Sequence, residues 1–238
     1  MQFNPAHKMV GGFTVSDGTI DFYLRINALI NEDSLVLDFG AGRASWFEDD
    51  ICDTRKKIRL LKGKVKQVIA VDVDEAVLDN RSSDKQIVIE GGVLDIDSQL
   101  VDLIVADYVL EHVEDTGAFY RQINEHLKSG GWFCARTPHK YGYVAIAASL
   151  IKNVLHSKVL KLIQPNRKEI DVFPTHYKLN RLRDIQKSFP NWETRTFIYR
   201  AEPAYYFGNK TIFQLQSLLH KFLPAFACGN IFVFVRKP

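Results

Sequence analysis

The sequence predicts an α/β protein built on a doubly wound sheet of about seven strands. Apolar, β-branched and aromatic runs recur along the chain without clean polar–apolar alternation, as in parallel strands that are covered on both faces. Helical patterns separate these runs, and such an alternation builds a parallel sheet with helices on both sides. The 238 residues, 46% of them hydrophobic, suffice for one large core.

The first half of the chain supplies most of the expected sheet. Strands are expected at 34–39, 67–73, 86–90, 102–108 and 132–137. Helices are expected between them, at roughly 48–62, 75–80 and 115–128. The last of these helices runs into "KSGG", a basic turn and two glycines that are typical of a helix C-terminus.

The second half is expected to continue the same domain. Residues 143–163 carry one apolar stripe at spacings of three and four, which predicts a helix, and 165–177 reads as a loop. The remaining expected elements are helices at 179–189 and 209–223 and strands at 192–200 and 230–238. No linker sequence separates a second domain, so we expect a single domain over 1–238.

Charge, cysteine usage and hydropathy exclude several classes of protein. The net charge of +3 is too small to indicate a nucleic-acid partner. The three cysteines are scattered, so we expect no metal site and no disulfides, and a reducing, cytoplasmic location. No apolar run approaches the roughly 20 residues of a transmembrane segment, and the N-terminus lacks the apolar core of a signal peptide.

The turn after the first strand carries the most informative signal. In "VLDFGAGRA" an acid, Asp38, precedes Gly40 and Gly42. Glycine permits positive φ and a close approach of backbone to a ligand, and a strand-to-helix turn with free N–H groups forms a cradle for a polar ligand. Ligands of such sheets bind beyond the carboxyl ends of the strands, where Asp72 and Asp107 are also expected.

The identity of the nucleotide depends on smaller details. Asp72, in "VIAVDVD", is placed to accept hydrogen bonds from two ribose hydroxyls, which fits NAD as well because two glycines and a later acid are a weak signal. Against NAD, Ser45 stands where the third glycine belongs, and the carboxylate of Asp38 suits a cationic ligand better than a pyrophosphate. The chain also leaves no room for a substrate domain of dehydrogenase size.

Four motifs in order, "VLDFGAGRA", "VIAVDVD", "DLIVADYVLEHVED" and "LKSGGWFCARTP", resemble class I S-adenosylmethionine-dependent methyltransferases of the small-molecule type with an "LEHV" motif. The resemblance covers residues 34–138 and implies a Rossmann-like fold with a helical insertion after the fifth strand. It implies that the final strand, "NIFVFVRKP", is antiparallel and inserted into the sheet. It further implies S-adenosylmethionine as cofactor, S-adenosylhomocysteine as product, and insertions at 138–178 and 201–229 on the substrate side.

The same resemblance assigns roles to the residues of the glycine turn. Gly40, Ala41 and Gly42 would bring backbone against the methionine and ribose parts of the cofactor. Asp38 would lie near its cationic amino group, directly or through water. The basic stretch 49–64 is expected to be a helix with a solvated face and no further role.

The later strand ends would complete the cofactor site. Asp72 would bind the ribose hydroxyls, Val73 would pack on adenine, and Asp107 and Tyr108 would lie beside the cofactor. The family often carries an acid after the third strand that faces the adenine amino group, but here Gly92 takes that place. The alternatives for this contact are Glu90, Asp95 and the backbone of Val93.

The resemblance leaves the methyl acceptor open. An oxygen nucleophile benefits from a base with a pKa near neutrality, which makes His112, His139 and His176 the candidate catalytic residues. The acceptor is expected to be a small or medium-sized molecule such as a sugar, an aromatic compound or a lipid-linked group. The motif Asn-Pro-Pro-Tyr of amino methylation is replaced by "ADYVLEH", so no nucleic acid is expected as a partner.

Two other functions fit parts of the pattern. One is a non-catalytic relative that binds S-adenosylmethionine without turnover. The other is an NAD-linked oxidoreductase or epimerase, although the Tyr-x-x-x-Lys pair of such enzymes is missing after the fourth strand. Lysines beside the apolar stripe of 143–163 also allow a weak contact with a membrane surface.

Overall fold

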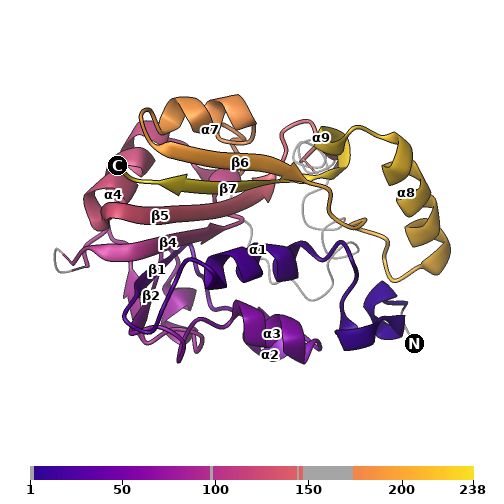
Figure 1. Cartoon of the computed structure of the whole chain (residues 1–238), viewed down its shortest axis with the longest axis horizontal. Coiled ribbons are helices and arrows are strands. Elements are labelled where there is room, and N and C mark those ends of the chain that lie inside the picture. Colours follow the sequence, from indigo (N-terminus) through magenta and orange to yellow (C-terminus); the bar gives the residue numbers. More distant parts are fainter. Residues whose placement is uncertain (1–2, 97–98, 144, 147–173) are drawn as a thin grey trace.

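A seven-stranded sheet organises the molecule (Figure 1). The structure is a computed structural model that describes residues 3–96, 99–143, 145–146 and 174–238. The strands are β1 (Leu35–Phe39), β2 (Gln67–Asp72), β3 (Lys85–Val88), β4 (Val101–Asp107), β5 (Leu127–Pro138), β6 (Glu193–Tyr199) and β7 (Asn230–Arg236). Their order is β3-β2-β1-β4-β5-β7-β6, and β7 runs antiparallel to both of its neighbours. The predicted fold class is therefore confirmed, including the inserted antiparallel last strand.

Helices cover both faces of the sheet. Figure 1 shows α1, α2 and α3 on one face and α4 and α7 on the other, with α8 and α9 beyond one end of the strands. The α-helices are α1 (Gly18–Asn27), α2 (Trp46–Asp49), α3 (Asp53–Arg59), α4 (Thr116–His126), α7 (Leu182–Ser188), α8 (Lys210–Phe222) and α9 (Ala225–Cys228). The 3-10 helices are η1 (Pro5–Lys8), η2 (Val10–Gly12), η3 (Glu75–Asp79) and η4 (Leu110–His112).

Each face of the sheet has its own hydrophobic core. Side chains alternate along a strand, so neighbouring residues of β1 enter different cores. Leu37 packs in the core that contains Phe119 of α4, whereas Val36 packs in the core that contains Phe22 of α1. The central strands are therefore buried on both faces, which explains why their sequences show no alternation.

The helix α1 was not among the expected elements, although its sequence contains a clear N-cap. The Asp17 carboxylate accepts hydrogen bonds from the backbone N–H groups of Thr19 and Ile20, at 2.9 and 3.1 Å. Three of its side chains belong to the hydrophobic core on this face of the sheet: Phe22, Tyr23 and Ile26. The same helix brings the Tyr23 hydroxyl to 3.2 Å from the carboxylate of Asp107 at the end of β4.

The single helix predicted at 48–62 was wrong. The chain forms two short helices, α2 and α3, because Asp50 accepts a hydrogen bond from the N–H of Cys52 (2.9 Å) and turns the backbone out of the helix. The Cys52 sulfur then caps α3 by accepting from the N–H of Arg55. The expected helix at 75–80 is the 3-10 helix η3, with Asp74 as its N-cap.

The glycines of "KSGG" do not end a helix. The helix α4 stops at His126, and Leu127–Pro138 belongs to β5. Gly130 and Gly131 exchange backbone hydrogen bonds with Lys237 at 3.0 Å, and a Cβ at Gly131 would lie 2.9 Å from the carbonyl oxygen of Asp102. Glycine is required here by close strand packing rather than by a helix end.

Much of the expected helix 143–163 and loop 165–177 lies outside the described residues. The described parts are a helical start at Tyr143 and Ala145–Ile146, and the segment from 174 onward. Within the described part of the chain, no helix is both long and apolar enough to cross a bilayer.

Candidate functional site

The glycine turn after β1 is pressed against two neighbouring strands. Gly40 has φ +70°, and a Cβ at this position would lie 2.5 Å from Cγ2 of Val109, so glycine is needed for the close approach. The N–H groups of Gly40 and Ala41 both donate to the Val71 carbonyl, at 2.8 and 3.1 Å. These N–H groups are therefore not free to form the expected cradle. What remains of the expectation is that glycine lets a ligand come close to the backbone of the turn.

Asp72 ties the end of β2 to this turn. Its Oδ2 accepts from the Gly42 N–H at 2.8 Å, and its Oδ1 accepts from the Asp74 N–H at 3.1 Å. Asp74, not Asp72, caps η3. Each carboxylate oxygen has a second lone pair, so Asp72 can still accept a hydrogen bond at each oxygen from a diol. The exposed side chain of Val73 lies next along the chain.

Asp38 lies close enough to two other acids, Asp107 and Asp72, for their charges to affect its pKa. Burial raises the pKa of Asp38 to about 7; nearby Arg59 opposes this rise, while the charges of Asp107 and Asp72 add to it. The carboxyl group faces a small pocket whose other lining residues include Tyr23, Trp46 and Arg59. An acid whose pKa is raised toward neutrality, in a pocket beside the glycine turn, is typical of a functional site.

Asp107, at the end of β4, is held entirely by protein groups. Arg136, paired with it in register on β5, donates to both carboxylate oxygens, at 2.5 and 3.0 Å. Arg59 and Tyr23 also donate to Oδ2, at 3.1 and 3.2 Å. Burial alone would raise the pKa of Asp107, but the two guanidinium groups hold it below its usual range. Its predicted contact with the cofactor stays a prediction, and its observed partners are internal.

Arg59 corrects the expectation that 49–64 has only a solvated basic face. Its guanidinium lies 4.5 Å from the ring centre of Trp46 and 5.4 Å from that of Tyr23. Its Nε is buried and has no hydrogen-bond partner among the described residues. A cation with a buried donor that lacks a partner therefore lines the same pocket as Asp38.

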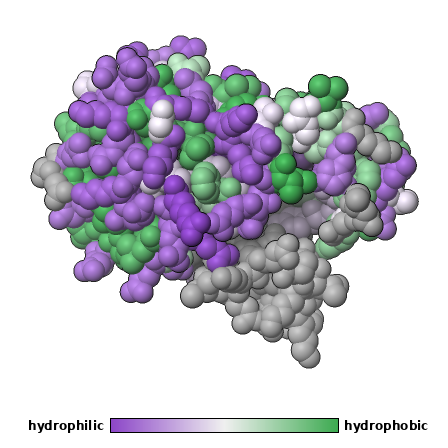
Figure 2. All heavy atoms as spheres, turned by 90° about the horizontal axis from the view of Figure 1, so that it is seen from below, coloured by the Kyte–Doolittle hydropathy of each residue, from purple (hydrophilic) through white to green (hydrophobic). Residues whose placement is uncertain are grey.

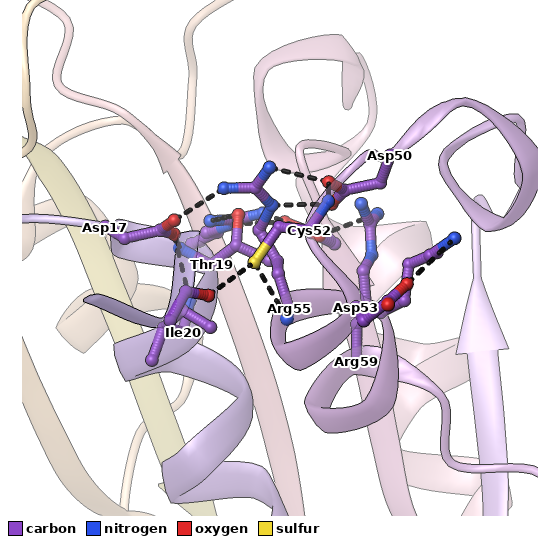
Figure 3. Close-up of polar contacts among 12 residues, drawn as sticks. Asp17, Thr19, Ile20, Asp50, Cys52, Asp53, Arg55 and Arg59 are labelled. Atoms are coloured by element: carbon purple, nitrogen blue, oxygen red, sulfur yellow. Dashed lines mark hydrogen bonds and ion pairs between the residues drawn. The ribbon is translucent and has the colours of Figure 1, made fainter. Parts of the chain in front are cut away.

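Arg55 has a structural role on the same helix. Figure 3 shows its guanidinium between two acids: it donates to Asp17 at 2.7 Å and to Asp50 at 2.5 and 2.6 Å. The side chain of Arg55 is only 21% exposed. This bridge joins the N-cap of α1 to the turn before α3, and thereby holds Arg59 and Tyr23 over the strand ends.

Tyr108 follows Asp107 in a left-handed backbone conformation, with φ +61°. Its ring lies 4.7 Å from the Arg136 guanidinium, and its hydroxyl accepts a hydrogen bond from Asn230 at 2.8 Å. The side chain remains 40% exposed. A strained backbone held by two partners presents an aromatic ring at the carboxyl end of β4.

The residues expected near adenine lie on an exposed loop after β3. Val93 is 68% exposed, and its N–H donates to the Glu90 carbonyl at 3.2 Å. The Gly92 carbonyl accepts from the Gln122 side chain at 2.7 Å. The Val93 N–H is thus engaged in a turn, so the adenine contact proposed for this backbone would fall to other atoms of the loop.

The three candidate histidines have different surroundings. The Nδ1 of His112 is 2.8 Å from the Pro174 carbonyl oxygen. The Nδ1 of His139 is 3.2 Å from the N–H of Tyr141, and burial together with Arg181 lowers the pKa of His139. The Nε2 of His176 lies 4.0 Å from a carboxylate oxygen of Glu114. Among the described residues, no contact joins any two of these three histidine rings.

Glu111, beside His112, is a buried acid whose role the sequence left open. It is 6% exposed, and burial raises its pKa to about 7. Its carboxylate accepts from the Thr137 hydroxyl at 2.8 Å, and that hydroxyl accepts from the Asn180 amide at 2.6 Å. Its carbonyl accepts from the His176 N–H at 2.7 Å. Glu111 therefore fastens the segment that begins at 174 to the "LEH" turn.

Glu111→Gln is expected to raise the free energy of unfolding at pH 8 by on the order of 3 kcal/mol. An acid whose pKa is raised on folding from near 4.5 to about 7 destabilises the fold as pH rises through that window, and has no such effect below it. Glutamine keeps an acceptor for Thr137. Urea unfolding at pH 4.5 and pH 8 measures the difference, with the exposed Glu125→Gln as control. An equal effect at both pH values would contradict the assignment.

The residues present fit a cofactor that combines a nucleoside with an amino acid. Asp72 offers acceptors beside the turn, and the neighbouring pocket pairs an acid, Asp38, with a cation, Arg59. Such a pair matches the ammonium and carboxylate groups of an amino acid. In the described part of the chain, no cluster of His, Cys, Asp and Glu is arranged to hold a metal ion.

Comparisons with known proteins agree with this geometry. A family model described as a methyltransferase domain matches residues 15–195. An S-adenosylmethionine-dependent methyltransferase from Mesorhizobium loti superimposes with a TM-score of 0.54 at 17% identity, covering 90% of this chain and 95% of its own. The N-methyltransferase NodS from Bradyrhizobium japonicum WM9, solved with S-adenosylhomocysteine, gives 0.52 at 11% identity, covering 94% and 90%.

The fold is also used by a protein named for other chemistry. The cyclase SpnF has a TM-score of 0.54 at 11% identity, covering 92% of this chain and 81% of its own. Structural likeness at such identities establishes the fold alone. No curated protein matches the sequence. The family match spans well over half of the residues, and the chain therefore belongs to the methyltransferase domain family, as a class I enzyme that uses S-adenosylmethionine.

Proposed function

We propose that this enzyme methylates a hydroxyl oxygen of a small or medium-sized acceptor, such as a sugar, an aromatic compound or a lipid-linked group. The observation that supports the proposal is the contact of His112 Nδ1 with the Pro174 carbonyl, in the turn that follows Asp107 and Tyr108 at the end of β4. S-adenosylmethionine supplies an electrophilic methyl group, so the protein has to align the acceptor, exclude water and remove a proton.

The tautomer of His112 supports its role as the base. A carbonyl oxygen only accepts hydrogen bonds, so the Nδ1 that faces Pro174 at 2.8 Å carries the proton. In the neutral imidazole the basic lone pair then belongs to Nε2. His139 has the opposite arrangement: the N–H of Tyr141 donates to its Nδ1, so its Nε2 carries the proton and acts as a donor. We assign His139 to acceptor binding rather than proton removal.

The substrate side is proposed to include both insertions, 138–178 and 201–229, of a single domain that works in the cytoplasm. Their described parts meet at the end of β5, where the rings of His139 and Phe226 lie 5.7 Å apart. Tyr143 also donates to and accepts from the backbone of Ala204, at 3.4 and 2.8 Å. Contact between the two segments supports a shared acceptor-binding surface.

We propose that uncharged and charged parts of the cofactor bind to different residues of the site. Asp72 would bind the ribose diol, with Gly40, Ala41 and Gly42 lying alongside. Asp38 and Arg59 would lie beside the amino acid part, with Asp38 toward the ammonium and Arg59 toward the carboxylate. The buried, unpartnered Nε of Arg59 supports this role. Val73, Val93 and Tyr108 keep their predicted positions around the cofactor as parts of the same proposal.

Affinity for S-adenosylhomocysteine is expected to rise roughly 5- to 10-fold from pH 6 to pH 7.5. A bound ammonium favours the ionised form of Asp38, whose pKa is about 7, so binding below that pH must release a proton. Calorimetry in two buffers of different ionisation enthalpy measures both affinity and proton release. Asp38→Asn should bind more weakly and flatten the pH dependence; an unchanged slope would remove Asp38 from the ammonium site.

His112→Asn is expected to lower kcat at least 100-fold, the order contributed by a general base, and to leave the Kd for S-adenosylhomocysteine within about twofold. Asparagine keeps a donor for the Pro174 carbonyl but lacks Nε2. The assay uses tritiated methyl donor with a panel of phenols, sugars, lipid-linked alcohols and amines. Methylation of amines alone would overturn the oxygen proposal. Cofactor binding with no product from any acceptor would favour a non-catalytic relative.

A further inference from the structure

The helix α8 presents an exposed apolar face on a part of the molecule that lies beyond the sheet (Figure 1). Phe222 is 82% exposed and Leu215 is 58% exposed. The exposed apolar residues occupy less than half of the helix circumference: Ile212, Leu215, Leu218, Leu219, Phe222 and Leu223. Seen from below, the lobe on the right in Figure 2 shows hydrophobic residues among hydrophilic ones.

The opposite side of α8 is anchored, so the exposed face is not a misplaced core face. The Phe213 ring lies 5.5 Å from that of Phe3. His220 is buried, with its ring 5.5 Å from that of Tyr143. Arg200 donates to the carbonyl groups of His220 and Leu223 and so closes the C-terminal turn of the helix. Orientation of the helix is therefore set by contacts on its inner side.

The chain segment that contains this face carries charge of one sign. Residues 203–238 contain no aspartate or glutamate. Lys210 and Lys221 are exposed on α8 and border the apolar face on one side. The nearest acid before this stretch, Glu202, is engaged by the Thr14 hydroxyl at 2.5 Å. An apolar helix face bordered by lysines and free of acids is the pattern of a helix that lies in a membrane interface.

We propose that the outer face of α8 binds the surface of an anionic lipid bilayer. A second copy of the chain is a poorer partner, because a two-fold interface would bring the same lysines toward one another. The segment 147–173 is also a poorer partner, because it carries five lysines and arginines against two acids. Anionic lipids supply both an apolar layer and the opposite charge.

Co-sedimentation of the full chain with vesicles tests the proposal without any methyl-transfer assay. The wild-type protein is expected to bind vesicles of phosphatidylcholine with 30% phosphatidylglycerol more tightly than vesicles of phosphatidylcholine alone. The double variant Leu215→Gln/Leu219→Gln is expected to lower the partition coefficient at least tenfold. The matched control is Leu24→Gln/Leu78→Gln, because these leucines are 52% and 60% exposed, against 58% and 49% for the α8 pair.

The outcomes separate the possible occupants. Loss of binding in the α8 variant but not in the control, with unchanged circular dichroism and unchanged S-adenosylhomocysteine affinity in both, supports the lipid surface. Failure of the wild-type protein to bind anionic vesicles overturns it, as does an equal loss in both variants. A third outcome is that the wild-type protein does not bind vesicles, is a dimer in light scattering, and becomes a monomer in the α8 variant. That outcome assigns the face to a second copy of the chain instead.

Discussion

Arg136→Met is expected to lower the free energy of unfolding by about 3–5 kcal/mol, the cost of taking from a buried charge the partner that binds both of its oxygens. Arg136 is 4% exposed and donates twice to Asp107, whose side chain is 5% exposed. Methionine fills most of the arginine volume, so the loss is mainly electrostatic. Urea unfolding at pH 7, followed by circular dichroism, measures the change against a total stability of roughly 5–15 kcal/mol.

The matched control is Arg195→Met on the edge strand β6. Arg195 also pairs with an acid, Glu193, at 2.7 Å, but its side chain is 71% exposed. Exposed pairs contribute about 0–1 kcal/mol, so this variant should stay close to the wild type. Adding Asp107→Asn to Arg136→Met should recover part of the loss, because the buried carboxylate that has lost Arg136 is then gone. Equal effects for the two arginine variants would show that burial of the Asp107–Arg136 pair has no special cost.

The sheet was readable from the sequence because each central strand is buried on both faces. A run such as 68–71 has to be apolar throughout to lie between two cores, and no distant contact is needed to recognise it. The break between α2 and α3 was not readable in the same way. It depends on Asp50 and Cys52 preferring local backbone hydrogen bonds over helical ones, and Arg55 then stabilises that choice from the following helix.

The candidate site was readable only in part, for a related reason. Gly40, Gly42 and Asp72 form contacts with neighbouring strand ends, so a local motif is enough to predict that they meet. Arg136 could have been recognised, because an arginine inside an apolar strand needs a buried acid, and the adjacent strand ends in Asp107. Arg59 could not, because its position over Trp46 and Tyr23 depends on the break before α3 and on the placement of α1.

Asp38 and Asp107 illustrate how one pair of strand ends supports two roles. Both carboxyl groups lie near Arg59, yet the pKa of Asp107 is lowered and that of Asp38 is raised to about 7. The difference comes from Arg136, which compensates Asp107 alone. Asp107 is thereby fixed as an anion inside the protein. Its charge helps to raise the pKa of Asp38, so that Asp38 loses its proton when a cation binds beside it.

Asp72→Ala is expected to raise the Kd for S-adenosylhomocysteine about 30- to 700-fold, which corresponds to roughly 2–4 kcal/mol for two lost hydrogen bonds to a charged acceptor. The structure adds a second contribution, because Asp72 also accepts from the Gly42 N–H and so holds the glycine turn. Calorimetry at pH 7.5 measures the affinity. The control Asp74→Ala removes an acid two residues away that only caps η3, and should leave the Kd within about threefold.

A 2′-deoxy analogue of the ligand separates the two contributions of Asp72. If Asp72 binds the ribose diol, the wild-type protein should discriminate against the analogue, and Asp72→Ala should bind the analogue and the parent ligand almost equally, giving a coupling energy of about 1–3 kcal/mol. If Asp72 only supports the turn, both proteins should discriminate to the same degree. Wild-type affinity in Asp72→Ala would remove the residue from the site altogether, and with it the geometric argument that places the ribose beside the turn at Gly42.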